Sequence, residues 1–161
     1  MVMPRTVAVM DPSNILLAGV GGIGCAWAQQ AHTKCEGSAH LVLIDADEKI
    51  FIDWGTAGQV TLQPPVGGRI PFKLWVHTHP RFASYWSITD TTSLSLGAGI
   101  LESAMVLGQP GPKHSSNRSF VDGENDAMLS KQGPLSQWTD EEPVPWTEWY
   151  GLNNINVEVM E

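Results

Sequence analysis

The apolar positions of the chain fall in short runs that are separated by turn-forming residues, a pattern typical of a domain rich in β-strands. The clearest run, HLVLIDAD at 40–47, is apolar on consecutive positions, as expected of a strand that is buried on both faces. Similar runs predict further strands at 6–10, 15–20, 49–55, 59–63, 72–78 and 103–108.

Two segments between these runs have helical composition. CAWAQQAHTK predicts a helix at about 24–34, and a shorter helix is expected at 90–101, although Gly97 and Gly99 weaken its second half. Four glycines at 19–24 would each cost about 1 kcal/mol inside a helix, so this stretch is predicted to be a turn or a broken helix start. The expected fold class is therefore α/β, with a mixed, curved β-sheet that carries one helix on each side.

The last third of the chain has a different character. Residues 109–151 are rich in Gly, Pro, Asn, Asp and Ser, but they also carry Trp138, Trp146 and Trp149. Free linkers are rarely aromatic, so these tryptophans are expected to anchor long loops on the domain. We therefore expect a single domain over 1–161, with a loop-rich, tryptophan-containing tail from about residue 109.

Composition narrows the classes of protein that fit. The chain has 9 Lys and Arg against 17 Asp and Glu, a formal net charge of -8. This balance argues against nucleic acid and anionic membrane as partners, because both require a basic face. The longest weakly polar run, 15–28, is too short to span a bilayer and lacks the basic flank of a signal peptide, so a cytoplasmic protein is expected. Cys25 and Cys35 do not form a CxxC motif and are expected to be small core residues.

Candidate chemistry is concentrated in the sequence WVHTHP and the residues that follow it. On a strand, His77 and His79 point to the same face about 6.5–7 Å apart, within reach of one metal ion. Pro80 is expected to end this strand, because it has no N–H for a ladder. A helix that begins at Ser87 would present Asp90 in its first turn, where the helix dipole favours a carboxylate. Two imidazoles and one carboxylate make a three-ligand zinc site that leaves a fourth position for water.

The same residues also allow a structural interpretation. The pattern S-x-x-D at 87–90 is close to a helix capping box, and a single histidine is more often a packed residue than a ligand. The capping interpretation does not account for HxHP and SxxD occurring together at a fixed gap. We therefore favour the metal site.

The sequence HTHP at 77–80, followed after six residues by S-x-x-D at 87–90, resembles the signature of the JAMM (MPN-plus) zinc metallopeptidases. This family includes deubiquitinases and prokaryotic enzymes that cleave ubiquitin-like proteins, and the resemblance covers residues 72–108 best. It implies a layered JAMM/MPN-like architecture, similar to that of cytidine deaminases. It also implies that His77, His79 and Asp90 hold Zn²⁺ and that the Ser87 hydroxyl stabilises the tetrahedral intermediate.

The resemblance further implies a ubiquitin-like protein or its conjugate as substrate. The bond that is cleaved would be a peptide or isopeptide bond at the C-terminus of that protein. The tail of the substrate would then lie extended along a sheet edge near the site, as an added strand.

The resemblance also implies a general base, which in the family is a glutamate at the start of an upstream strand. This base takes a proton from the attacking water and passes it to the leaving amine. Glu36 precedes the strand at 40–47, with Ala39 where the family has glycine, whereas Glu48 has the bulky Phe51 at that place. Glu36 is therefore the favoured catalytic base, and Glu48 stays open as the alternative.

The glycine-rich stretch GVGGIG supports a different hypothesis. Strand, glycine turn, helix, strand and a terminal acid form a nucleotide-binding fingerprint, and residues 14–48 resemble the ATP-binding start of ThiF-type adenylating enzymes. Asp45 or Asp47 would then bind the ribose hydroxyls, with phosphates held at the helix start. Two alternatives to a zinc peptidase therefore stay open, a ThiF-like nucleotide-binding module and a non-catalytic JAMM-like scaffold.

Overall fold

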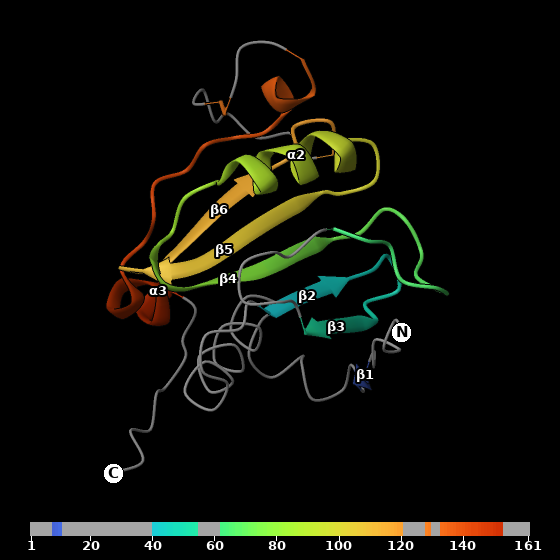
Figure 1. The fold of residues 1–161 in the computed structure, drawn as a ribbon, viewed down its shortest axis with the longest axis horizontal. Helices are drawn as coiled ribbons and strands as arrows, with labels where there is room; N and C mark the ends of the chain where they lie inside the picture. Colours follow the sequence, from blue (N-terminus) through green and yellow to red (C-terminus); the bar gives the residue numbers. More distant parts are fainter. Residues whose placement is uncertain (1–7, 11–39, 55–61, 121–127, 130–132, 153–161) are drawn as a thin grey trace, which may run out of the picture.

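A six-stranded sheet forms the centre of the protein, in the order β1-β3-β2-β4-β5-β6 (Figure 1). The computed structural model describes residues 8–10, 40–54, 62–120, 128–129 and 133–152. The strands are β1 (Ala8–Met10), β2 (His40–Ile44), β3 (Ile50–Trp54), β4 (Leu74–Ala83), β5 (Ser103–Gln109) and β6 (Pro112–Ser116). Strands β4 and β5 are parallel, and the other neighbouring pairs are antiparallel. The predicted α/β class with a mixed sheet is therefore confirmed.

Each face of the sheet packs against its own helical element. The helical elements are α2 (Ile88–Gly97), the 3-10 turn η2 (Pro134–Gln137) and α3 (Trp146–Leu152). Because strand side chains alternate between faces, Leu43 and Trp75 pack with Leu94 of α2, whereas Val42 packs with Trp149 of α3 on the opposite face. Among the described residues, the helices are too short or too polar to cross a membrane.

The turn that joins β2 to β3 is built around a buried carboxylate. β2 stops before Asp45, although the predicted strand at 40–47 extends further. One carboxylate oxygen of Asp45 accepts the backbone N–H groups of Asp47 and Lys49, each at 2.9 Å, and the other accepts that of Arg69 at 3.0 Å. Asp45 thus ends the strand by satisfying the backbone of the turn and of a distant loop.

Strand β4 is longer than the predicted strand at 72–78. It begins at Leu74 and runs to Ala83, so the prediction that Pro80 ends it is wrong. The ladder with β5 shifts its register between Thr78 and Ala83. Pro80, which cannot donate to a ladder, lies within this irregular stretch, and the chain therefore continues as strand beyond it.

Helix α2 begins and ends earlier than the predicted helix at 90–101. Its N-cap is Ser87, and its last residue is Gly97. A Cβ atom at Gly97 would come within 2.9 Å of the Leu62 side chain, so glycine allows the helix end to approach the neighbouring loop. The prediction that a helix begins at Ser87 is confirmed.

Other predicted elements have mixed outcomes. The predicted strands at 6–10 and 103–108 correspond to β1 and β5. Of the predicted strand at 59–63, the structure describes Leu62 and Gln63, and neither belongs to a strand. Several predictions lie outside the described residues, namely the strand at 15–20, the helix at 24–34, and the burial of Cys25 and Cys35.

The tail contains regular structure that the sequence analysis did not predict, namely β6, η2 and α3. Its tryptophans behave as the predicted anchors. Trp138 and Trp149 are buried, and the Trp146 indole N–H donates to the carbonyl of Gly108 at 3.0 Å. The tail therefore contributes to the core on both faces of the sheet.

Candidate metal centre

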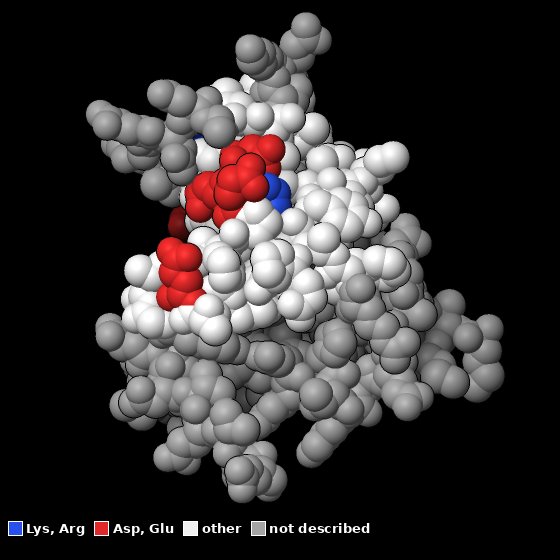
Figure 2. All heavy atoms as spheres, turned by 90° about the vertical axis from the view of Figure 1, so that its left-hand side faces the viewer, with Lys and Arg blue, Asp and Glu red and all other residues white. Residues whose placement is uncertain are grey.

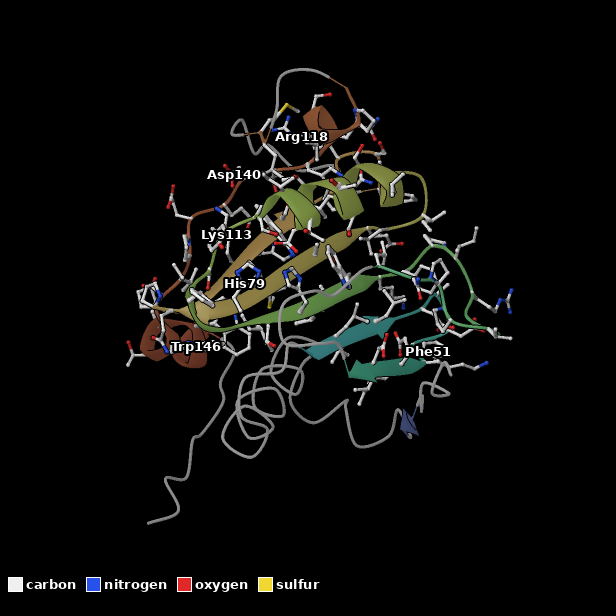
Figure 3. The ribbon with its side chains drawn as sticks, viewed as in Figure 1. Phe51, His79, Lys113, Arg118, Asp140 and Trp146 are labelled. Carbon is white, nitrogen blue, oxygen red and sulfur yellow. The ribbon has the colours of Figure 1, made fainter. Side chains whose placement is uncertain are left out.

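Two histidines of β4 supply the imidazoles of the centre. His77 and His79 lie two positions apart on the strand, and their Nε2 atoms are 3.3 Å apart, as the predicted common face requires. His77 pairs with Leu41 of β2 on one side and with Val106 of β5 on the other, so it lies in the middle of the sheet. Figure 3 shows His79 near the end of β4 from which the chain leads to α2.

The carboxylate of the centre comes from the first turn of α2. The Asp90 N–H donates to Ser87 Oγ at 3.2 Å, and the Ser87 N–H donates to Asp90 Oδ2 at 2.8 Å. This is the capping box that was the structural interpretation of S-x-x-D. The two interpretations are compatible, because the cap fixes the Asp90 carboxylate beside the histidines.

The three side chains converge at distances that suit one small cation. Asp90 Oδ1 lies 3.0 Å from His77 Nε2, and Asp90 Oδ2 lies 3.3 Å from His79 Nε2. The ligand atoms of a tetrahedral ion with bonds of about 2.0–2.1 Å are about 3.3 Å apart. Among the described residues, His77, His79 and Asp90 form the one group of three possible ligands whose atoms converge in this way.

Protons alone do not satisfy this arrangement. Two neutral imidazoles and a carboxylate make three mutual contacts of 3.0–3.3 Å. If both Nε2 atoms carry hydrogen, the two N–H groups face each other; if one does not, its lone pair faces a carboxylate oxygen. Both of these placements leave one unfavourable contact. A shared cation would accept lone pairs from all three side chains and would remove the conflict.

The ionisation states also suit a divalent cation. Burial lowers the pKa of the His77 imidazole, against the opposing effect of its hydrogen bond to Asp90. Burial acts to raise the pKa of Asp90, but the hydrogen bonds with His77, His79 and Ser87 outweigh it and hold that pKa well below its usual range. A neutral imidazole next to an ionised carboxylate is the ligand form that metals require.

Aromatic rings surround the histidines, and the sequence analysis did not identify them. Trp75 stacks on His77 with ring centroids 4.7 Å apart, and the Trp86 ring lies 6.1 Å from His77. Tyr85 meets His79 edge-on at 4.9 Å. The position of Trp75 beside His77 could have been predicted, because Trp75 precedes His77 by two residues and therefore lies on the same face of the strand.

An apolar pocket of about 200 Å³ lies over β2 and β3, one strand away from the centre. Its lining residues are Leu41, Leu43, Phe51, Ile52, Asp53, Gln63, Pro64, Pro65 and Val66. Leu41 is the cross-strand partner of His77, and directly opposed partners share one face of a sheet. The pocket therefore begins one strand away from the metal ligands, on the same face.

The predicted catalytic residues have different positions. Ser87 is adjacent to the ligands: its hydroxyl accepts from the Asp90 N–H at 3.2 Å and also hydrogen-bonds with the Asp90 carboxylate. Glu48 pairs with Lys73 at 2.9 Å, and Lys73 precedes His77 by four residues, or about 13 Å along a strand. Glu36 lies outside the described residues. In the sequence it precedes the first residue of β2 by four positions, and β2 is the strand whose Leu41 pairs with His77.

The strand arrangement bears on the nucleotide hypothesis. β2 is paired on both sides by antiparallel strands, β3 and β4, whereas the dinucleotide fold places this strand parallel to its neighbours. The Asp45 carboxylate is fully buried and accepts hydrogen bonds from three backbone N–H groups, so it is not accessible to ribose hydroxyls. Asp47 is more exposed and lies 3.4 Å from Arg69.

Comparison with known proteins does not place the chain in a family. No family model matches it, and no curated protein or solved structure matches it. The resemblance to the JAMM signature therefore stands on the motif alone. The function has to be inferred from the geometry of the centre.

Proposed function

We propose that the chain is a zinc-dependent metallopeptidase of the JAMM type, which hydrolyses a peptide or isopeptide bond. The observation that carries this proposal is the convergence of His77, His79 and Asp90, whose ligand atoms are 3.0–3.3 Å apart in a largely buried site. Two imidazoles and one carboxylate are a ligand set typical of catalytic zinc, which keeps its fourth position for water. A mixed sheet in which α2 directly follows the histidine-bearing strand β4 is compatible with the JAMM/MPN-like architecture that the motif implies.

The residues of the chain have separate roles in this hydrolysis. Zinc, when bound, lowers the pKa of a water and polarises a carbonyl oxygen. Ser87 donates its hydroxyl hydrogen to the oxygen that becomes negative as water adds to the carbonyl carbon. Glu36 takes a proton from the attacking water and passes it to the amine nitrogen as the C–N bond breaks. The products are a free carboxylate and an amine.

The proposed substrate is the C-terminus of a ubiquitin-like protein, in a precursor or a conjugate. The apolar pocket that begins at Leu41, the cross-strand partner of His77, supports a peptide substrate, because it would accept an apolar side chain of an extended segment that leads to the centre. Val66 lies at the rim of this pocket and is fully exposed. Val66→Asp should raise KM several-fold and leave metal affinity unchanged, which steady-state kinetics and metal titration would measure.

Cleavage of a ubiquitin-like fusion by matched variants tests the proposal. Glu36→Gln should lower the rate about 10²–10⁴-fold, as expected for loss of a general base, while its zinc content stays that of the wild type. Glu48→Gln is the matched control and should remain active. Loss of activity in the second variant and not in the first would make Glu48 the base. A zinc-loaded wild type that cleaves no such fusion would overturn the proposal for this substrate.

Metal analysis separates the enzyme from the two alternatives. The purified protein should contain about one zinc per chain, and His77→Ala should contain none. A non-catalytic scaffold has no need of an intact ligand set, so equal and low metal content in both proteins would favour it. Binding of ATP without metal would favour the nucleotide-binding module.

A further inference from the structure

The imidazole of His77 is enclosed by two indole rings. Trp75 stacks on it with centroids 4.7 Å apart and an interplanar angle of 23°. Trp86 approaches from the β4–α2 connection, with centroids 6.1 Å apart and a tilt of 45°. His77 is the ligand that the protein buries most deeply, so its orientation is set by these neighbours.

No described residue forms a hydrogen bond with Nδ1 of this imidazole. A ligating histidine generally donates its second ring N–H to a carboxylate, carbonyl or water, which sets the orientation of the ring. His77 Nδ1 is buried and has no hydrogen-bond partner among the described residues, and the same holds for Trp75 Nε1 and Trp86 Nε1. Within the described part of the chain, the only polar contacts of the His77 ring are therefore those of Nε2, and Nδ1 does not help to orient it.

Trp75 itself is held firmly. Its side chain is fully buried, and in the ladder it lies opposite Leu43 of β2 and Ala104 of β5. The small Ala104 leaves room for the indole, and Leu43 and Leu94 pack in the same hydrophobic cluster. The indole thus has a fixed plane, which it imposes on the stacked imidazole.

We propose that Trp75 is a positioning residue for the metal centre, with Trp86 as a weaker second wall. This inference rests on the proposed metal centre. Stacking on Trp75 keeps the His77 ring in the plane that directs Nε2 at Asp90 and His79, in place of a hydrogen bond from Nδ1. Of Trp75, Trp86 and Trp149, Trp75 is then the indole whose environment should respond most to metal.

Two replacements of Trp75 separate stacking from bulk. Trp75→Phe keeps an aromatic face, whereas Trp75→Leu keeps apolar volume without one. Trp149→Leu is the matched control, because Trp149 is also buried but packs on the opposite face of the sheet. We expect Trp75→Leu to weaken metal affinity about 10–100-fold, as loss of an outer partner of a ligating histidine does. Trp75→Phe should retain most of the wild-type metal affinity, and Trp149→Leu should have the metal affinity of the wild type.

The measurement is competition between the folded protein and a chelator for Co²⁺, followed by the visible absorption of the bound ion. A changed absorption spectrum in Trp75→Leu, restored in Trp75→Phe, reports ligand geometry that a general loss of stability does not alter. Equal affinities and spectra in wild type and Trp75→Leu would overturn the inference and leave the metal centre intact. A wild type that binds no Co²⁺ or Zn²⁺ would instead overturn the proposed function.

A second measurement does not depend on the folding of Trp75→Leu. The wild type is labelled with 5-fluorotryptophan and loaded with Co²⁺, and the Trp75 resonance is assigned from its absence in Trp75→Phe. We expect the Trp75 signal to shift or broaden most, the Trp86 signal less, and the Trp149 signal least. A Trp75 signal that Co²⁺ leaves unchanged would contradict the proposed stack.

Discussion

Two histidine–carboxylate pairs of this protein have nearly the same separation and very different surroundings. His77 Nε2 lies 3.0 Å from Asp90, with side chains that are 2% and 5% exposed. His114 Nδ1 lies 3.1 Å from Glu141, with side chains that are 34% and 32% exposed. Distance alone therefore does not distinguish a metal ligand from a surface contact.

The partners of each carboxylate make the difference. Asp90 faces two imidazoles and the capping N–H of Ser87. Glu141 has one imidazole, and it also accepts from the Thr139 hydroxyl at 3.1 Å and lies near the charge of Lys113. Figure 2 shows acidic side chains gathered beside a basic one on the face that is at the left of Figure 1, where Figure 3 labels Lys113 and Asp140.

The comparison teaches what a site requires. In the His114 pair, the imidazole and the Thr139 hydroxyl already satisfy the carboxylate, which ties the segment around Glu141 to β6. In the centre, the possible ligand atoms of His77, His79 and Asp90 face one another with no cation of the described residues among them, so the arrangement could hold a metal ion.

The largest expected difference between the two pairs is in metal binding. His77→Ala removes one of three ligands and should reduce zinc affinity by more than about 100-fold, beyond the effect of losing an outer partner. His114→Ala should retain wild-type affinity, because it is not a ligand. Zinc content after dialysis checks both variants, and equal loss in both would remove the distinction that we draw.

Metal should also stabilise the protein through one pair and not the other. Zinc at 100 times its dissociation constant should add about 2.7 kcal/mol to the free energy of unfolding. His114→Ala should show this gain, and His77→Ala should show none. Denaturant unfolding with zinc and with a chelator measures the difference, and a gain that persists in His77→Ala would place the stabilising ion elsewhere.

His77 and Glu141 should contribute to stability in different pH windows when a chelator is present. The pKa of His77 is lowered from 6.5, so the unfolded chain binds a proton that the folded chain does not, and stability falls as pH drops below about 6.5. The hydrogen bond from His114 lowers the pKa of Glu141 from 4.5, so its contribution is present above that pH and is lost below it. His77→Gln should flatten the first window, and Glu141→Gln should reduce the acid loss of stability, to which the lowered pKa of Asp90 also contributes. Identical pH profiles for both variants would contradict this assignment.

The smallest expected effect is that of the surface pair on stability. Glu141→Gln should cost at most about 1 kcal/mol at neutral pH, because partly exposed ion pairs contribute little. Urea unfolding measures this cost, with Glu142→Gln as an exposed control. A loss of several kcal/mol would mean that the tail depends on this contact far more than the exposure of the pair suggests.

The ligands of the centre were predictable because local rules place them. Because side chains alternate between the two faces of a strand, His77 and His79 lie on one face of β4. The helix cap at Ser87 puts Asp90 in the first turn of α2. Neither rule needs knowledge of distant contacts. The same applies to β2 and β5, whose runs of buried apolar residues indicate strands directly.

Other features were not predictable, because contacts far apart in the sequence decide them. Strand β6 has the polar sequence PKHSS, and its buried polar groups are satisfied by the tail, for example the Lys113 ammonium by the carbonyl of Glu141 at 2.6 Å. β4 passes Pro80 because its ladder with β5 is irregular there. The approach of Trp86 to His77 depends on how the β4–α2 connection folds back.

X-ray absorption at the zinc edge, on protein loaded with one equivalent of zinc, tests the central claim most directly. We predict four nitrogen or oxygen ligands at about 2.0–2.1 Å, with the scattering pattern of two imidazoles. His77→Ala and Asp90→Ala should each lose this spectrum, and His114→Ala should retain it. A six-coordinate, water-rich zinc in the wild type, or a spectrum that His77→Ala leaves unchanged, would contradict the claim that His77, His79 and Asp90 hold one metal ion.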